Sequence, residues 1–158
     1  MRAGLGGLEG RPLKKGDALP LAAATAPERA ERRVPKWDLA PPTRVRVVLG
    51  PQDDHFTDRA RQTFRESTYT VSRQSDRMGM RLEGPALEHG KGFNIVSDGT
   101  APGSIQVPGN GLPIVLLADR PTTGGYPKIA TVASADVPAL GRLRPVASIA
   151  FDPISVED

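Results

Sequence analysis

A glycine-rich polar segment carries the side chains best suited to bind a small polar ligand. It consists of Thr122, Thr123, Gly124, Gly125 and Tyr126, and Lys128 follows it. Two hydroxyls, a phenol and an ammonium thus stand beside successive backbone N–H groups, a combination that can form an anion-binding concavity. We predict that residues 122–126 bind substrate and that Lys128 is a catalytic residue whose ammonium faces a carboxylate, carbamate or phosphate.

Asp119 is the second candidate catalytic residue. It ends an apolar stretch, residues 114–118, and precedes Arg120. Its carboxylate can orient a substrate amide or act as a general base. Alternatively, Asp119 accepts hydrogen bonds from turn amides while Arg120 pairs nearby. The residues alone favour neither interpretation.

Arg77, Arg81 and Gln106 are further candidates for substrate binding. Alternation over residues 76–83 places Arg77 and Arg81 on one face of a predicted strand and three apolar side chains on the other. The polar face can line a cleft, with Gln106 from a neighbouring strand. The spacing favours the alternative, in which the two arginines form exposed cross-strand pairs.

Short elements must position these residues. Strands 104–107 and 114–118 flank Asn110-Gly111, the strongest local signal for a tight hairpin. We expect a strand at 44–49, a helix over 54–66 with one apolar face, and a short helix at 136–140. Further strands are expected at 69–72, 92–96, 129–132 and 146–151.

Composition supports a mainly β fold. The 158 residues include 17 Gly and 16 Pro, which would interrupt long helices and favour short strands joined by turns. We predict a β-barrel with one or two short helices.

Several classes of site are excluded. The chain contains no Cys, which excludes disulfides, thiolate metal sites and cysteine nucleophiles. The common phosphate-binding, dinucleotide-binding, zinc-protease and serine-hydrolase signatures are missing. His55 and His89 are interpreted as surface residues, and no metal site is predicted. The apolar runs are too short to span a membrane, so we predict a cytoplasmic protein without membrane contact.

The formal net charge of +3 is unevenly distributed. Residues 1–50 carry 10 Lys and Arg against 5 Asp and Glu, whereas residues 51–158 carry 11 against 13. The basic cluster consists of Arg29, Arg32, Arg33 and Lys36, with Trp37 as the one aromatic neighbour. Nucleic-acid binding usually adds several stacking aromatics, so we interpret the cluster as a solvated linker. We predict an inter-domain segment and linker at 1–42 and a packed domain at 43–158.

An ordered set of short motifs resembles the C-terminal half of a known family. The motifs are Val47 to Gln52, Tyr69 to Ser72, Ser75 to Gly84, Gly103 to Pro113, Leu116 to Arg120 and Thr122 to Ile129. They resemble the biotin-dependent carboxyltransferase family, which includes the C-type subunits of 5-oxoprolinase and the second subunits of allophanate hydrolase. Residues 6–11 and 16–17 resemble the segment that precedes the second half of family members.

The resemblance implies a cyclophilin-like β-barrel that works as a subunit. In one branch it implies ATP-dependent opening of 5-oxo-L-proline to L-glutamate, with ATP bound by the complex. In the other, a related domain transfers a carboxyl group from carboxybiotin to urea. The chain has no Met-Lys-Met carrier motif; biotin is therefore expected only as a visiting group on another protein.

Members of the family usually have about twice this length, so the chain is expected to be a fragment, a split subunit or a truncated reading frame. We expect a homo- or hetero-oligomer with other oxoprolinase or carboxyltransferase subunits, inactive alone and acting on a small amide or carboxylate. The alternative from another functional class is a regulatory module that binds an inhibitor of a histidine kinase, as some relatives do.

Overall fold

The computed structural model describes residues 7–22 and 39–156, and the single positions 25, 28, 30, 32, 33 and 35. The chain divides into two units, residues 1–37 and 38–158. In the first unit, Leu8 and Arg11 pair through their backbones, and the Arg11 guanidinium holds the Asp17 carboxylate at 2.8 Å. Of the basic cluster and its aromatic neighbour, Arg29, Lys36 and Trp37 lie outside the described residues.

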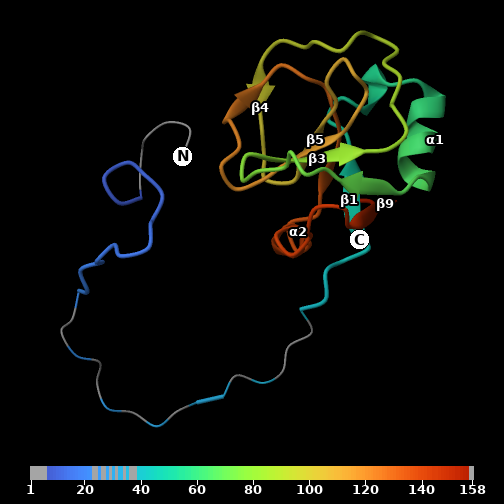
Figure 1. The fold of residues 1–158 in the computed structure, drawn as a ribbon. Helices are drawn as coiled ribbons and strands as arrows, with labels where there is room; N and C mark the ends of the chain where they lie inside the picture. The colour runs from blue at the N-terminus through green and yellow to red at the C-terminus, as the bar shows by residue number, and fades with distance from the viewer. Residues whose placement is uncertain are drawn as a thin grey trace. The chain divides into compact units, whose positions relative to one another are not determined.

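Seven strands among the described residues close into a barrel in the order β1-β8-β5-β6-β3-β2-β9. They are β1 (Arg44–Leu49), β2 (Tyr69–Val71), β3 (Gly79–Glu83), β5 (Ser104–Gln106), β6 (Ile114–Leu116), β8 (Lys128–Val132) and β9 (Ser148–Pro153). Figure 1 labels β1, β3, β5 and β9 of this barrel. Neighbours are antiparallel except β1 and β9, which run parallel and close the barrel. Two short strands, β4 (Asp98–Gly99) and β7 (Thr123–Gly124), form a separate ribbon.

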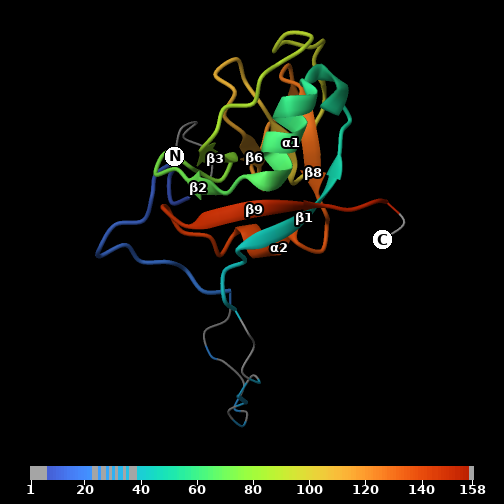
Figure 2. The same ribbon diagram turned by 90° about the vertical axis from the view of Figure 1, so that its right-hand side faces the viewer.

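The two α-helices of the described residues lie on opposite sides of the β1–β9 pair (Figure 2). They are α1 (Asp58–Glu66) and α2 (Val137–Leu140), and a 3₁₀ turn, η1, spans Asp53–His55. Thr57 caps α1, because its hydroxyl accepts a hydrogen bond from the Ala60 amide at 3.1 Å. The mainly β barrel with short helices is therefore confirmed.

The core fills the barrel and the space beneath α1. Val45 and Val47 point inward from β1, as period-two alternation predicts. Ala60 and Phe64 are buried on one face of α1, and the Phe64 ring stacks on Phe151 with centroids 4.7 Å apart. Each buried Val or Phe side chain contributes about 1.5–3 kcal/mol relative to full exposure, so packing supplies the rigid support for the loops.

The predicted strand over residues 76–83 begins later than expected, at Gly79. The Asp76 carboxylate accepts hydrogen bonds from the Met78 and Gly79 amides, which holds a turn before β3. As a result Met78 is 42% exposed rather than buried, and Arg77 lies in the turn. Arg77 and Arg81 therefore do not share one strand.

The strand predicted at 92–96 is absent from the described residues, where this segment forms a loop. Gly92 adopts φ +89°, a left-handed conformation that interrupts extended structure. The Ile95 amide still donates to the Gly125 carbonyl at 2.9 Å, so the loop lies along the polar segment.

The hairpin formed by β5 and β6 is confirmed, with Ile105 opposite Val115. Its connection, residues 107–113, is longer than a tight two-residue turn. Gly111 has φ +73° and donates its amide to the Pro108 carbonyl at 2.9 Å.

The two histidines are half-buried rather than on the surface. His89 Nε2 lies 3.0 Å from the Val107 carbonyl, and its ring lies 5.0 Å from that of Phe56. In the described part of the chain, no helix has the length and apolar character needed to cross a membrane.

Candidate functional site

Lys128 begins β8 and is almost completely buried, with 2% of its side chain exposed. Its Nζ donates to Asp98 Oδ2 at 2.7 Å and to the Gly99 carbonyl at 3.1 Å. Both acceptors belong to β4, about 30 positions earlier in the chain. The ammonium therefore joins β8 to the β4–β7 ribbon.

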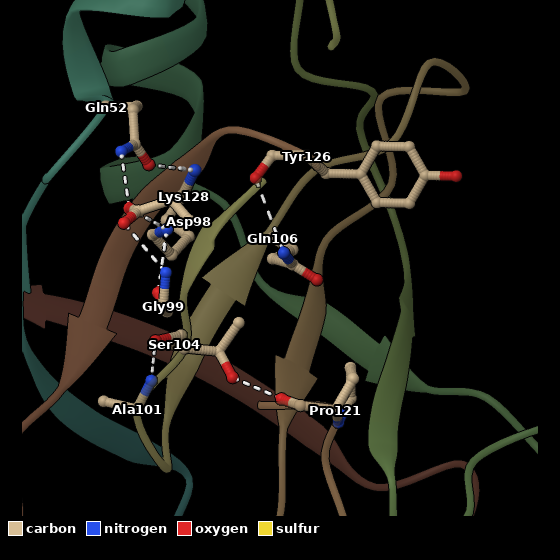
Figure 3. A network of polar contacts seen from close by, with 10 residues as sticks. Gln52, Asp98, Gly99, Ala101, Ser104, Gln106, Pro121, Tyr126 and Lys128 are labelled. Carbon is tan, nitrogen blue, oxygen red and sulfur yellow. Dashed lines mark hydrogen bonds and ion pairs between the residues drawn. The ribbon is translucent and has the colours of Figure 1, made fainter. Parts of the chain in front are cut away.

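Gln52 completes this contact from the segment that follows β1 (Figure 3). Its backbone amide donates to the Lys128 carbonyl at 3.0 Å, and its Oε1 accepts from the Lys128 amide at 3.1 Å. Its Nε2 donates to Asp98 Oδ2 at 3.3 Å. The hydrogen bond from Lys128, and then that from Gln52, lower the pKa of Asp98. We refer to Gln52, Asp98, Gly99 and Lys128 as the lysine network.

Sequence reasoning did not identify Gln52 or Asp98 as site residues. Gln52 directly follows Gly50-Pro51 in one of the motifs that carry the family resemblance, which is the one available signal. Asp98 has no such signal, because it is brought to Lys128 by the pairing of β4 with β7.

Gln106 supports the glycine-rich segment through its buried carboxamide. Its side chain is buried, and its Nε2 donates to the Tyr126 carbonyl at 3.5 Å. A Cβ atom on Gly124 would overlap this Nε2, whereas one on Gly125 would make ordinary contact with the Ile95 carbonyl at 3.5 Å. A side chain at position 124 would therefore force the Gln106 carboxamide to move.

The outer face of the segment is open. Thr122, Thr123 and Tyr126 are exposed, and the Tyr126 ring points away from the lysine network in Figure 3. Thr123 and Gly124 are held in register by pairing with Gly99 and Asp98. The structure thus presents two hydroxyls and a phenol on a supported loop.

Asp119 lies in a different pair. Arg77 donates to its carboxylate through Nε at 2.7 Å and Nη2 at 3.0 Å, and the Asp119 amide donates to the Arg77 carbonyl at 2.9 Å. Both side chains are exposed, and the arginine lowers the pKa of Asp119. In the described part of the chain, no hydrogen bond joins this pair to Gln106 or Lys128.

Arg81 lies apart from both the lysine network and the Arg77–Asp119 pair. It is exposed on β3 and lines a small hollow of about 120 Å³ with Asn110 and Leu112. The structure therefore brings together three of the predicted parts of the site: residues 122–126, Gln106 and Lys128. Arg77 and Asp119 form a separate pair. Arg81 belongs to neither group. Among the described residues, no group of three or more acidic, histidine or cysteine side chains is arranged to hold a metal ion.

Similar proteins include the C-type subunits of two bacterial 5-oxoprolinases. The chain is 39% identical to that of Escherichia coli (strain K12) and 37% identical to that of Haemophilus influenzae, each over 160 residues. Both matches cover all of this chain and 50% of the relative, so the chain spans about half their length. A urea amidolyase from Lachancea kluyveri is 30% identical over 97% of this chain and 10% of its own length.

Solved structures agree with this grouping. The crystal structure of TTHA0988 is 36% identical, with a TM-score of 0.68 over 82% of this chain and 25% of that one. The K. lactis urea amidolyase is 27% identical, with a TM-score of 0.67 over 71% of this chain and 7% of that one. A family model described as the carboxyltransferase domain, subdomain A and B, matches residues 1–153, and the chain therefore belongs to that family.

Proposed function

We propose that this chain is the carboxyltransferase-type half of a C-type 5-oxoprolinase subunit, which acts with other subunits in the ATP-dependent opening of 5-oxo-L-proline to L-glutamate. The observation that carries the proposal is 39% identity to such a 5-oxoprolinase subunit across the whole chain. Identity to the urea amidolyase is lower, at 30%. Residues 43–158 form the barrel domain of the proposed subunit, and residues 1–42 connect it to the remainder.

The polar segment supports a site for a cyclic amide. A lactam offers one N–H donor, one carbonyl acceptor and, in 5-oxoproline, one carboxylate. Thr122, Thr123 and Tyr126 carry hydroxyls that both donate and accept hydrogen bonds. We assign them to the substrate, with the backbone of Gly124 and Gly125.

The buried side chains of Lys128 and Gln106 support these groups. Two of the three N–H groups of the Lys128 ammonium are directed at Asp98 and Gly99. We therefore assign Lys128 to holding the loop in place, rather than to direct reaction with substrate. Preorganisation of this kind lowers the cost of ordering a site during the reaction.

Asp119 and Arg77 are assigned to orienting the substrate. The hydrogen bond from Arg77 lowers the pKa of Asp119, which makes its carboxylate a weaker general base. Arg81 lies on a separate surface and has the weakest claim to substrate contact.

ATP is assigned to another part of the complex. Within this chain, the Lys128 ammonium is already bound by the Asp98 carboxylate, which leaves it poorly placed to bind a phosphate. Biotin enters this proposal only as a group carried by another protein. The site of action is the cytoplasm, in a homo- or hetero-oligomer.

Co-expression with the remaining subunits tests the proposal. The purified complex should release glutamate from 5-oxoproline only with ATP, and this chain alone should release none. Tyr126→Phe should lower turnover, whereas Arg44→Gln, on an exposed arginine paired with Asp152, should leave it unchanged. A complex with all its subunits but no ATP-dependent glutamate release would refute the proposal.

Urea is the alternative substrate, favoured by the similarity to urea amidolyases. The same complex should then consume ATP with urea and bicarbonate, supplied with a biotinylated carrier protein, and not with 5-oxoproline. The two assays separate the branches.

A further inference from the structure

An apolar pocket opens beside α2, on the part of the barrel that carries Arg77. Its volume is about 790 Å³, within the range of about 300–1,000 Å³ that is typical of small-ligand sites. Val71, Met80 and Leu140 line it, and each is at most 3% exposed. Leu117 also lines it, so the pocket offers a hydrocarbon surface backed by the barrel core.

Three of the four polar residues that line the pocket are engaged by the protein itself. The Ser75 hydroxyl exchanges hydrogen bonds with the backbone of Arg81. The Asp76 carboxylate accepts two amides of the turn before β3. The Arg77 guanidinium is bidentate with Asp119, which neutralises its charge.

Arg120 is the exception. It is half-buried, and its Nε donates to the Thr100 carbonyl at 3.3 Å, which anchors the guanidinium at the pocket. Among the described residues, no other hydrogen bond or ion pair engages this guanidinium. Its two terminal nitrogens are therefore available to a ligand.

We propose that this pocket binds an amphipathic monocarboxylate, with the hydrocarbon part on Met80 and Leu117 and the carboxylate on the terminal nitrogens of Arg120. A guanidinium presents parallel N–H groups that match the two oxygens of a carboxylate. Arg120 supplies one positive charge, and the Asp76 carboxylate on the same pocket wall adds a negative charge that would repel a doubly charged phosphate ester, so a monocarboxylate is favoured. The proposal uses neither the lysine network nor residues 122–126, and it shares with the oxoprolinase assignment only Arg77, which lies on the pocket wall.

Sodium octanoate and octanamide are matched probes, since they share a hydrocarbon chain and differ in charge. The purified chain is titrated with each by calorimetry, and methyl NMR signals locate the site. We expect octanoate to shift the signals of Met80, Leu117 and Leu140 and to bind at least about tenfold more tightly than octanamide, as expected for a charged hydrogen bond.

Variants separate charge from shape. Arg120→Gln should remove the preference for octanoate while octanamide binding is retained. Ala118→Trp, at an exposed position on the pocket wall, should block both probes. Arg44→Gln is the matched control and should leave both affinities unchanged, because Arg44 pairs with Asp152 and does not line the pocket.

Two outcomes would overturn the proposal. One is the absence of shifts at the pocket methyl groups at millimolar octanoate. The other is equal affinity for octanoate and octanamide in the unmodified chain. Loss of octanoate binding in both Arg120→Gln and the Arg44→Gln control would show a general charge effect and would also count against it.

Discussion

Two ion pairs of the candidate site have the same closest N–O distance and very different surroundings. Lys128–Asp98 and Arg77–Asp119 both meet at 2.7 Å. The Lys128 side chain is 2% exposed, whereas that of Arg77 is 76% exposed; the two carboxylates are alike, at 52% and 51%. The difference between the pairs is therefore the burial of the cation.

This difference separates a structural contact from a surface contact. Exposed pairs contribute little because water and salt screen them. A buried cation that loses its partner is costly, since its desolvation is no longer offset. Lys128 also shares Asp98 with Gln52, whose side chain connects the segment after β1 to β8 and β4. The comparison predicts that substitutions of Lys128 lower the stability of the chain strongly and that substitutions of Arg77 lower it weakly.

Lys128→Ala should have the largest effect on stability. It removes a buried side chain and its ion pair, so the free energy of unfolding should fall by about 2–4 kcal/mol, as for other large buried side chains. Urea denaturation measures the change.

Two further variants sharpen this result. Lys128→Met keeps most of the buried volume and should recover the packing part of the loss. Arg77→Ala should leave the urea midpoint nearly unchanged. Equal losses for Lys128→Ala and Arg77→Ala would contradict the distinction between the two pairs.

Gly124→Ala should have the next largest effect. The new methyl group would displace the Gln106 carboxamide, at a cost of about 1–3 kcal/mol typical of overpacking. Gly125→Ala is the matched control, since its methyl group meets only ordinary contacts. Thermal unfolding and the glutamate-release assay should both separate the two variants, and identical behaviour would show that Gln106 does not support the loop.

Acid should weaken the lysine network and so lower the stability of the folded chain. Hydrogen bonding to Lys128 lowers the pKa of Asp98 in the folded chain. At acidic pH the folded state then binds fewer protons than the unfolded state. The contribution of the Asp98–Lys128 contact to stability is therefore complete above the ordinary Asp pKa of about 3.9, and it is lost as pH falls through the lower pKa of the folded state.

Urea denaturation between pH 7 and pH 3 tests this prediction. The free energy of unfolding of Lys128→Met should differ from that of the unmodified chain more at pH 7 than at pH 3. Arg77→Met should show the same trend through Asp119, but added salt should reduce it strongly because both groups are exposed. A difference for Lys128→Met that grows on acidification would contradict the assignment.

Arg81→Met should have the smallest effect. Arg81 is exposed, and its position on β3 is fixed by the backbone rather than by its guanidinium. Both stability and glutamate release in the complete complex should stay unchanged. A marked loss of activity would place Arg81 in the substrate site and would revise the division into three regions.

Local patterns were sufficient for most elements of the barrel. Strand β1 has the predicted bounds, 44–49, because its alternation and the following Gly50-Pro51 mark both face and end. Ala60 and Phe64 are buried as helical spacing predicted. However, α1 begins at Asp58, so Phe56 is buried outside the helix, in a bridge with His89. The prediction was wrong where a side chain forms hydrogen bonds with the nearby backbone. The Asp76 carboxylate holds a turn at a position where the alternation of apolar and polar residues indicated a strand.

The sequence by itself therefore determined the fold class, the main strands and the polar segment 122–126, because each depends on neighbours within a few positions. Only the tertiary structure decided what Lys128 contacts. Asp98 is 30 positions away and Gln52 is 76, and neither separation follows any helical or strand period. Barrel closure and the β4–β7 ribbon bring these residues together, and burial of the ammonium then makes that contact structural, whereas the equally short pair at Arg77 stays in water.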